Sequence, residues 1–468
     1  MKSTARLALA CCLCAAALAA PATGARPSAR PDRTAAPRPA QAAPRQPPAP
    51  QPAQPPAPRQ PRDERLWRRA LEIHRKAVVV DGHNDITEHM ADTGYDIGTP
   101  SAGKYHTDLA RLMEGGVTGQ FFSVYVDRKY AGVDFINRNY VREGGSARRA
   151  LDLIDVMHRA VERHPDRMML AVSTADIRRA KRERKVAMLL GIEGGHAIEN
   201  SLSALRQFYR LGVRYMTLTH NNTNEWADAC CDAARHGGLS EFGREVVREM
   251  NRLGMFVDVS HVSDETMNDV LDVTTAPVIA SHSSARALNG HRRNIPDELL
   301  RRIAKNGGVV MVNFYPAFID ERVRLAGLER DERLKDQRAA LRERFSDDPA
   351  RLEEELNKLN AANPLPPAPL SILIDHIDHI AKVAGADHVG LGSDFDGVPT
   401  LPVGMEDVSK LPVITYELLR RGYGETDVRK ILGGNAMRAF AEVERVAGIT
   451  RRRVSGDGSR RRLGDASK

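Results

Sequence analysis

Eight short apolar segments, each followed by a helical or loop segment, constrain the fold of this chain more than any other feature. They are rich in Val, Ile, Met or Phe, which is typical of parallel strands buried on both faces. The segments cover residues 77–81, 117–126, 186–192, 213–219, 254–260, 276–281, 308–314 and 388–393. Amphipathic helical patterns lie between several of them, at residues 147–163, 201–211, 240–253 and 295–306. Strands alternating with helices in this number predict an α/β fold, a (β/α)8 TIM barrel over residues 63–450.

An open, doubly wound sheet is the competing architecture. It is disfavoured because no Gly-rich phosphate-binding loop follows any of the predicted strands. The barrel carries one long insertion after its seventh strand, at about residues 320–369, ahead of a helix at residues 370–384. This insertion is dense in Arg, Glu and Lys with weak helical periodicity and then becomes Pro-rich. We predict a helical excursion over the mouth of the barrel, and both a lid and a plain surface hairpin fit the pattern.

The net charge of +8 belongs to the two ends of the chain. The first 62 residues carry a net charge of +8 and the last 18 carry +5, so the 388 residues between them carry −5. A nucleic-acid binder needs its basic groups on the folded surface, so this distribution argues against one. Residues 26–62 hold 13 of the 27 prolines and predict an extended, disordered linker. Residues 451–468 predict a second basic, disordered tail.

The first 25 residues predict a secretory signal peptide. Two positive charges precede an apolar run that is too short to span a bilayer, and small-x-small cleavage patterns follow. A lipoprotein cut at Cys11, Cys12 or Cys14 is an alternative, although the apolar run before each cysteine is short. The expected location is therefore periplasmic, secreted or envelope-associated, and the basic linker offers a contact to an anionic envelope. Because Cys230 and Cys231 are adjacent, no disulfide framework is expected.

Six of the eight predicted strands end in His, Asp or Glu, at the end of a barrel where active sites lie. His83 and Asp85 follow the first strand, and alternation along an extended segment lets both face one point. The later strands present Glu193 with His196, then His220, His261, His282, and finally Asp394 with Asp396. Imidazole and carboxylate without thiolate suit Zn²⁺ or a similar divalent ion. So many ligands suit two ions that share a carboxylate and hold a hydroxide between them, with an unligated carboxylate to move the proton.

Seven motifs give the chain a family resemblance. They are VDGHND at residues 80–85, GIEGGH at 191–196, YMTLTH at 215–220 with WAD at 226–228, DVSHVS at 258–263, SHSSA at 281–285, RRNIP at 292–296 and GSDFDG at 392–397. Together they closely resemble the membrane (renal-type) dipeptidases, binuclear zinc peptidases of the amidohydrolase-like barrel class. The resemblance spans about residues 66–446, and its motifs are long and occur in the family's order.

The resemblance implies roles for individual residues. It gives His83 and Asp85 to one zinc, makes Glu193 the bridging ligand, and gives His261 and His282 to the second zinc. Three further residues meet the substrate. His220 is implied as a non-ligand group that stabilises the oxyanion, Arg293 as the residue that holds the substrate's C-terminal carboxylate, and Asp394 as the catalytic proton shuttle. The residue pattern alone separates neither His220 from the ligands nor Asp394 from Asp396.

The chain also departs from the family. The disulfide cysteines of its mammalian members are absent, no apolar C-terminal anchor signal is present, and the insertion after the seventh strand is longer. The family suggests a homodimer. Among the remaining histidines, His196 is equally consistent with a pocket position and with an ordinary one. His291 is expected at the surface, and His376 and His379 on a solvated helix face. His74, His89 and His106 show no ligand pattern.

These observations predict an exported metallo-dipeptidase that hydrolyses dipeptides with a zinc-bridging hydroxide. A C-terminal D-residue is expected to be tolerated, because the family also accepts β-lactam-bearing dipeptide analogues. Two alternatives stay open. One is another binuclear amidohydrolase reaction, on N-acyl amino acids, lactams or lactones. The other is a metal-stabilised protein that binds the cell envelope through residues 26–62.

Overall fold

The computed structural model describes residues 62–131 and 145–456. The predicted signal peptide, nearly all of the predicted linker and the last 12 residues lie outside this range. The predictions of export and of disorder at the N-terminus therefore stay predictions.

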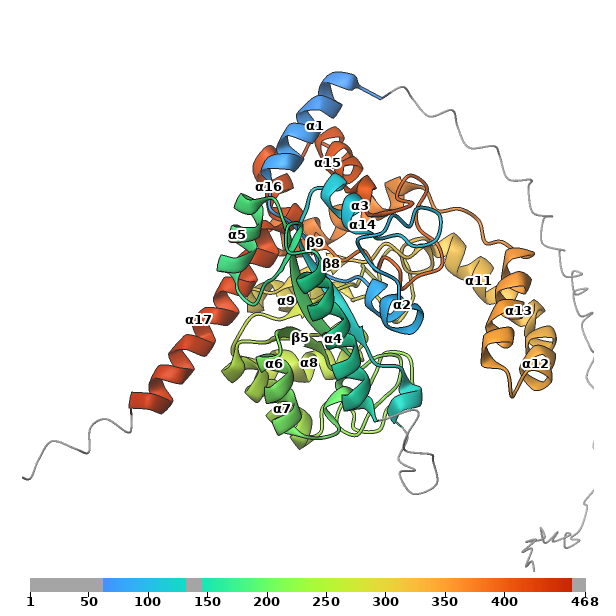
Figure 1. Cartoon of the computed structure of the whole chain (residues 1–468), viewed down its shortest axis with the longest axis horizontal. Coiled ribbons are helices and arrows are strands. Elements are labelled where there is room, and N and C mark those ends of the chain that lie inside the picture. Colours follow the sequence, from blue (N-terminus) through green and yellow to red (C-terminus); the bar gives the residue numbers. More distant parts are fainter. Residues whose placement is uncertain (1–61, 132–144, 457–468) are drawn as a thin grey trace, which may run out of the picture. The chain divides into compact units, whose positions relative to one another are not determined.

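Eight parallel strands close into a barrel, as the sequence predicts. Figure 1 shows helices around these strands. The barrel strands are β1 (Val79–Asp81), β2 (Val117–Tyr125), β4 (Val186–Glu193), β5 (Val213–Thr217), β6 (Phe256–Asp258), β7 (Ile279–Ala280), β8 (Val309–Val312) and β9 (Val389–Leu391). Each pairs with its sequence neighbours in the barrel, and β1 pairs with β9. The pairing of β2 with β4, from Gly119 opposite Ala187 to Tyr125 opposite Glu193, completes the ring. All eight fall within or next to the predicted apolar segments.

One strand was not predicted. β3 (Met168–Leu170) pairs only with the start of β4, outside the barrel. It is three residues long and partly exposed, so it has neither the length nor the apolar run of a buried strand.

Alternate side chains of the strands pack on opposite sides of the barrel wall. In β4, Ala187 and Leu189 belong to the inner cluster, which also holds Phe121 and Phe256. Met188 and Leu190, between them, pack outward against the helices. This period of two explains why both faces of each strand are apolar.

Helices surround the barrel. They are α1 (Glu64–Lys76), α2 (Ile86–Thr93), α3 (Leu109–Glu114), α4 (Ser146–Arg163), α5 (Thr174–Glu183), α6 (Leu202–Arg210), α7 (Glu241–Leu253), α8 (Asp264–Val273), α9 (Asp297–Asn306), α10 (Pro316–Ile319), α11 (Glu321–Arg333), α12 (Lys335–Arg344), α13 (Pro349–Ala361), α14 (Leu370–Ala384), α15 (Leu411–Arg420), α16 (Glu425–Arg429) and α17 (Asn435–Gly456). The predicted helices correspond to α4, α6, α7, α9 and α14. Serine N-caps begin several of them; Ser201, Ser240 and Ser263 each accept a backbone N–H three residues on.

Helix α17 closes the N-terminal end of the barrel. Its Phe440 ring lies 5.4 Å from that of Phe256, and Ala436 and Met437 join the inner cluster. Gly433, just before α17, lies so close to β1 that a Cβ there would be 2.4 Å from the Val78 carbonyl oxygen. Because this end is filled by apolar side chains, polar chemistry is left to the opposite end, where the strands terminate.

The same helix runs into the predicted C-terminal tail. The tail is predicted to begin at residue 451, whereas α17 continues to Gly456; the rest of the tail lies outside the described residues, and its disorder stays a prediction. The arginines at residues 451–453 are good helix formers and extend a helix that tertiary packing has already fixed.

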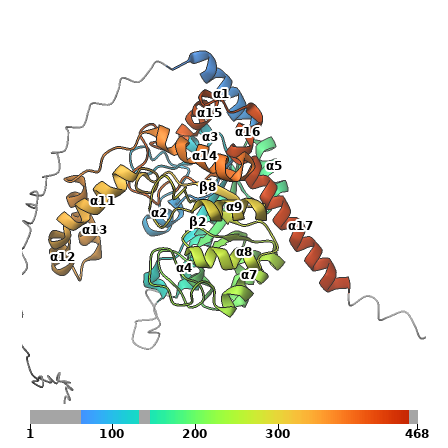
Figure 2. The same ribbon diagram turned by 180° about the vertical axis from the view of Figure 1, so that it is seen from behind.

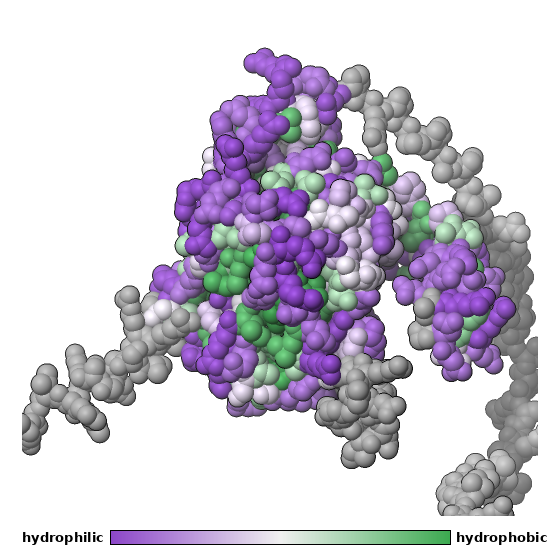
Figure 3. All heavy atoms as spheres, in the orientation of Figure 1, coloured by the Kyte–Doolittle hydropathy of each residue, from purple (hydrophilic) through white to green (hydrophobic). Residues whose placement is uncertain are grey.

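The insertion, residues 320–369, is helical as predicted and forms α11, α12 and α13. In Figures 1 and 2 the three helices form one group beside the barrel. Arg338 of α12 links the three helices, because it donates hydrogen bonds to Asp331 of α11 and to Asn360 of α13. Figure 3 shows a mainly hydrophilic surface on these helices with small apolar areas. In the described part of the chain, no helix is long and apolar enough to cross a membrane.

Candidate metal centre

The chemically important side chains lie where the barrel strands end. β1 leads into His83 and Asp85, and β4 ends at Glu193. His261 and His282 follow β6 and β7 within three residues. Because all eight strands are parallel, their C-terminal ends meet at one mouth, opposite α17.

Three imidazoles converge on the carboxylate of Glu193. His261 Nε2 lies 2.8 Å and His282 Nε2 3.4 Å from Glu193 Oε1. His83 Nε2 lies 3.3 Å from the other oxygen, Oε2. Burial alone would raise the pKa of Glu193, but its contacts with the three histidines outweigh burial and hold that pKa well below the usual range. Glu193 is therefore a carboxylate with two histidine nitrogen atoms at one oxygen and a third at the other.

Each of these histidines is held from behind through its Nδ1 atom. His83 Nδ1 lies 2.8 Å from the Tyr215 hydroxyl, and His261 Nδ1 lies 3.1 Å from Asn221 Oδ1. His282 Nδ1 lies 2.8 Å from Ser281 Oγ, which itself donates to Asp258. Asn221 Oδ1 can only accept, so Nδ1 of His261 carries the proton, and the same tautomer suits the other two rings. Outer partners of this kind orient metal-ligating histidines.

The resulting arrangement fits a cation. With Nδ1 protonated, every Nε2 lone pair points into the centre, where His261 Nε2 and His282 Nε2 lie only 2.9 Å apart. His83 Nε2 is buried and makes no hydrogen bond. Lone pairs facing one another and carboxylate oxygens in a buried site repel unless a positive charge lies between them. Nitrogen and carboxylate donors without thiolate suit zinc and similar ions.

Three overlapping groups of candidate ligands occur in the described residues. Within each group the ligand atoms lie within 4.8 Å of one another. The groups are His83 with Glu193 and His282, Glu193 with His220 and His261, and His83 with Asp85 and Asp394. Glu193 belongs to two of them, as a carboxylate shared between two ions would.

Two carboxylates complete one side of the centre. Asp85 Oδ2 lies 3.2 Å from His83 Nε2, and Asp394 Oδ2 accepts a hydrogen bond of 2.8 Å from the Asn313 amide. Burial, followed by the charge of Asp85, raises the pKa of Asp394 to about 7. Gly397 lies against both groups, and a Cβ there would be 2.2 Å from Asp85 Oδ2.

Backbone strain is concentrated here. His261, Asp394 and Asp396 have φ values of 67°, 63° and 66°, in the left-handed region that few non-glycine residues adopt. Such conformations cost energy, and they persist where the surroundings fix a side chain in a required direction. Asp396 is fixed by exchanging hydrogen bonds with His106: its backbone N–H donates to His106 Nδ1, and its Oδ1 accepts from the His106 backbone N–H.

His220 lies on the other side of the centre. Its ring centroid is 4.5 Å from that of His261 and 4.8 Å from that of Tyr125, which meets it edge-on. Burial lowers the pKa of His220 and so favours the neutral ring. His220 also forms a group of candidate ligands with Glu193 and His261, so its position suits both a metal ligand and a group that contacts the substrate.

Arg293 is buried beside the same histidines. Its guanidinium donates to Ser283 Oγ and to the carbonyl oxygen of His282, both at 3.1 Å, and lies 5.5 Å from the centroid of the Phe318 ring. The Nε atom is buried and has no partner. A guanidinium held in this way still has N–H donors to offer an anion.

The structure thus brings together every site residue that the sequence singled out. The residues that sequence reasoning missed are the ones that hold them: Tyr215, Asn221, Ser281 and Asn313. Tyr215 and Ser281 lie inside the quoted motifs. Nothing local marks Asn221 or Asn313 as a partner of His261 or Asp394, because those contacts form only when the barrel closes.

Predictions for several other histidines change. His376 does not lie on a solvated face; it is 0% exposed, accepts from the Ala285 N–H and lies 2.9 Å from the Ile319 carbonyl oxygen. His379 is half-buried and pairs with Asp297. His291 is also half-buried, with its ring against Phe318. His196 is 4% exposed. Within the described residues the cysteines are Cys230 and Cys231, both free, the first buried and the second exposed.

Comparisons with known proteins show which proteins the chain resembles. A family model described as membrane dipeptidase (peptidase family M19) matches residues 67–453. The structure resembles the crystal structure of the probable dipeptidase PvdM from Pseudomonas aeruginosa, at a TM-score of 0.69 and 27% identity, over 82% of this chain and 100% of that one. It also resembles dipeptidase AC, a metallopeptidase of family M19, at a TM-score of 0.62 and 25% identity, over 78% of this chain and 98% of that one. A metallopeptidase from Rhodobacter sphaeroides, solved with a phosphinate mimic of L-Ala-D-Ala, shares the fold at a TM-score of 0.62 and 24% identity, over 79% and 100% of the two chains.

Proposed function

Because the chain belongs to the membrane dipeptidase family of metallopeptidases, we propose that it hydrolyses the peptide bond of dipeptides with two zinc ions bound at the barrel mouth. The observation that carries this proposal is the convergence of three inward-facing Nε2 atoms on Glu193, beside a buried arginine.

The proposed ligands fall on either side of Glu193. His83 and Asp85 would hold one ion, His261 and His282 the other, and Glu193 would bridge them. Zinc is favoured over magnesium because nitrogen atoms form so much of the donor set, whereas magnesium takes oxygen ligands almost exclusively. Divalent cations in this centre would polarise the scissile carbonyl and lower the pKa of a water molecule.

The chain's own residues would orient the substrate. The Arg293 guanidinium, tied to Ser283 and to the His282 carbonyl, would bind the C-terminal carboxylate of the dipeptide. A carboxylate held at a fixed distance from the metal ligands selects for length, so dipeptides should be cleaved faster than tripeptides. Arg293 would contact the carboxylate and not the C-terminal side chain, which supports tolerance of a D-residue at that position.

Two groups would serve the reaction itself. Asp394, whose pKa burial and Asp85 raise to about 7, can take up and release a proton at neutral pH, and we assign it the transfer to the leaving amine. The neutral His220 ring would donate a hydrogen bond to the oxygen that becomes negative in the transition state.

A second candidate is hydrolysis of N-acyl amino acids by the same centre, since they present the same carboxylate to Arg293. Assays of purified, zinc-loaded protein distinguish the two candidate activities. We expect L-Ala-L-Ala and L-Ala-D-Ala to be cleaved and N-acetyl-Ala to be cleaved at least about 100-fold more slowly, because it offers no free α-amine (about 2.7 kcal/mol at the transition state). Equal or faster cleavage of N-acetyl-Ala would favour the second candidate.

Export belongs to the proposal as well. The charged start, short apolar run and small-residue sites of residues 1–25 support cleavage of a signal peptide. The mature N-terminus of protein recovered from expressing cells tests it. A terminus within about residues 19–26 is expected from these sites, whereas an intact Met1 would contradict export by this route.

A further inference from the structure

A second pocket opens beside the candidate metal centre. It has a volume of about 510 Å³ and is lined by His89, Lys104, Tyr105, His106, Asn357, and residues 396–399. Gly397 belongs both to this pocket and to the centre, because a Cβ there would lie 2.2 Å from Asp85 Oδ2 and 2.6 Å from Asp394 Oδ1. Gly397 is thus the boundary between the centre and the pocket, and a group that extends past it from a substrate at the centre would enter the pocket. We call it the Lys104 pocket.

The Lys104 pocket and Arg293 lie at the ends of different strands around the barrel mouth. Arg293 contacts Ser283 and His282, which follow β7. The pocket is built from the loop after β9 and from residues 89–106, which follow β1. In the ring of strands, β7 is separated from the β9–β1 pair by β8. If Arg293 binds the C-terminal carboxylate, the pocket faces the N-terminal residue of the dipeptide.

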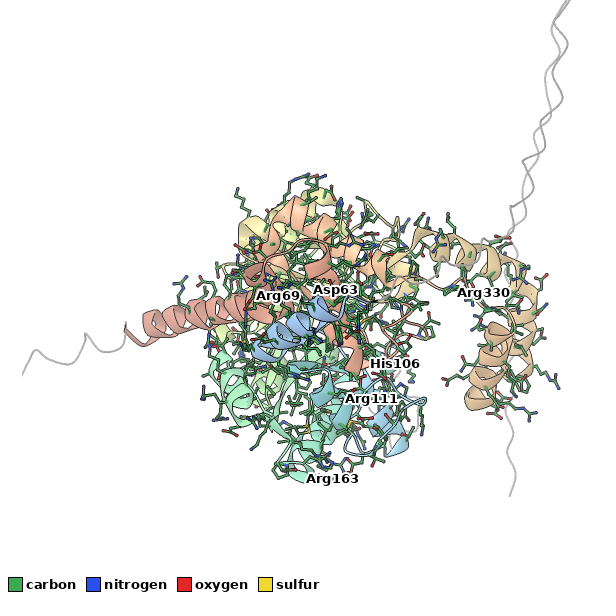
Figure 4. The ribbon with its side chains drawn as sticks, turned by 90° about the horizontal axis from the view of Figure 1, so that it is seen from above. Asp63, Arg69, His106, Arg111, Arg163 and Arg330 are labelled. Carbon is green, nitrogen blue, oxygen red and sulfur yellow. The ribbon has the colours of Figure 1, made fainter. Side chains whose placement is uncertain are left out.

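The insertion supplies one wall of the Lys104 pocket. Asn357 of α13 is the residue through which this helix reaches it. Figure 4 shows His106 on the side of the barrel that faces the helices of the insertion. The pocket is thus formed partly by the segment in which this chain is longer than the family pattern, so the insertion bears on substrate choice.

Two groups of the pocket, Lys104 and His106, can donate hydrogen bonds to an anion. Lys104 carries an exposed ammonium that lies 4.9 Å from the centroid of the Tyr105 ring. His106 Nδ1 accepts the Asp396 backbone N–H, so a neutral His106 ring bears its proton on Nε2 and can donate it. The pocket's own carboxylate, that of Asp396, is only 2% exposed and accepts the His106 backbone N–H.

Resting on the proposed dipeptidase function, we propose that the Lys104 pocket binds the side chain of the substrate's N-terminal residue and favours an acidic one. A glutamate side chain there would meet the Lys104 ammonium and the imidazole of His106. A glutamine of equal size would gain no charge pairing, and a lysine would meet a like charge.

The test compares kcat/KM for Glu-Ala, Gln-Ala and Ala-Ala in the zinc-loaded, full-length protein. The informative quantity is the ratio of Glu-Ala to Gln-Ala, because it cancels changes common to both substrates. We expect a ratio above one in the wild type and about a fivefold lower ratio in Lys104→Met, the scale of a partly exposed ion pair. Lys382→Met is the matched control, since Lys382 is exposed on α14, away from the pocket. Its ratio should equal that of the wild type.

A second variant tests the wall that the insertion supplies. Asn357→Asp places a negative charge at the pocket without removing Lys104, and it should also lower the ratio. A wild-type ratio of one or less, or a ratio that Lys104→Met leaves unchanged, would overturn this inference while Ala-Ala cleavage still supported the proposed function. Failure to cleave any dipeptide would overturn both.

Discussion

Replacing Gly397 by alanine should damage the catalytic site without damaging the fold. An ideal Cβ at this position lies 2.2 Å from Asp85 Oδ2 and 2.6 Å from Asp394 Oδ1. Ordinary carbon–oxygen contacts begin at about 3.3 Å, so the Asp85 carboxylate would have to retreat by about 1 Å. A displacement of that size at a reacting centre costs about 100-fold in rate, equivalent to about 2.7 kcal/mol.

The cost to folding should be small for two reasons. The overlapping atoms are the ends of side chains, which can move, and Gly397 is exposed with a backbone conformation open to alanine. The lower entropy of the unfolded chain also offsets part of any strain, by about 0.4–1 kcal/mol. We therefore expect a Tm close to that of the wild type when both proteins are stripped of metal.

The assay measures kcat/KM for Ala-Ala, together with zinc affinity and the Tm of the metal-free protein. Gly424→Ala is the matched control, because nothing lies within 4 Å of a Cβ there and its φ is −72°. The control should behave as wild type, and Gly397→Ala should lose about 100-fold in kcat/KM. Wild-type kinetics in Gly397→Ala would refute the placement of Asp85 and Asp394 in the working site.

Three further predictions concern Arg293, the metal and pH. Arg293→Ala should lower kcat/KM for Ala-Ala by about 100-fold, since it removes charged hydrogen bonds to the substrate carboxylate. The variant should also cleave Ala-Ala and its C-terminal amide equally well; if it still prefers the free carboxylate, Arg293 does not bind that group. Chelation should lower the Tm and abolish hydrolysis, and zinc should restore both where magnesium does not; recovery with magnesium alone would refute the nitrogen-rich ligand set. Burial lowers the pKa of His74 and of His376 to about 4, so both stay neutral in the folded protein and bind protons on unfolding. The free energy of unfolding is therefore unaffected by the titration of these two histidines above about pH 6.5. It falls as the pH drops from about 6.5 toward 4, by about 2 kcal/mol for each histidine between pH 7 and pH 5. Thermal unfolding of metal-free His74→Gln/His376→Gln should show a weaker pH dependence of Tm than the wild type; an equal dependence would contradict this account.

The sequence predicted the barrel well because its signals are local. Each buried strand is a continuous apolar run, and in six of eight cases His, Asp or Glu ends it. The same pattern therefore predicts both the number of strands and the polar residues at the barrel mouth. The insertion's helices were also visible, through weak periodicity. β3 was missed because a three-residue strand at the outside of a barrel carries no pattern of its own.

The errors arose where tertiary contacts decide. His376 lies on a helix among charged neighbours, Asp375 and Asp378, which made the whole face look solvated. In the structure Arg421 binds those two aspartates, while His376 points inward between Ala285 and Ile319. The local sequence does not show that His376 is buried while the two aspartates bind Arg421, because these partners lie about 40 to 90 residues away in the chain.

Metal stoichiometry measured beside activity tests the central claim most directly. Purified protein loaded with zinc and freed of excess metal should bind two zinc ions per chain and cleave Ala-Ala. Because Glu193 lies between His83 on one side and His261 with His282 on the other, Glu193→Gln should lose hydrolysis and at least one of the two ions. Wild-type protein that binds no zinc, or a Glu193→Gln variant that keeps both ions and full activity, would contradict a binuclear centre bridged by Glu193.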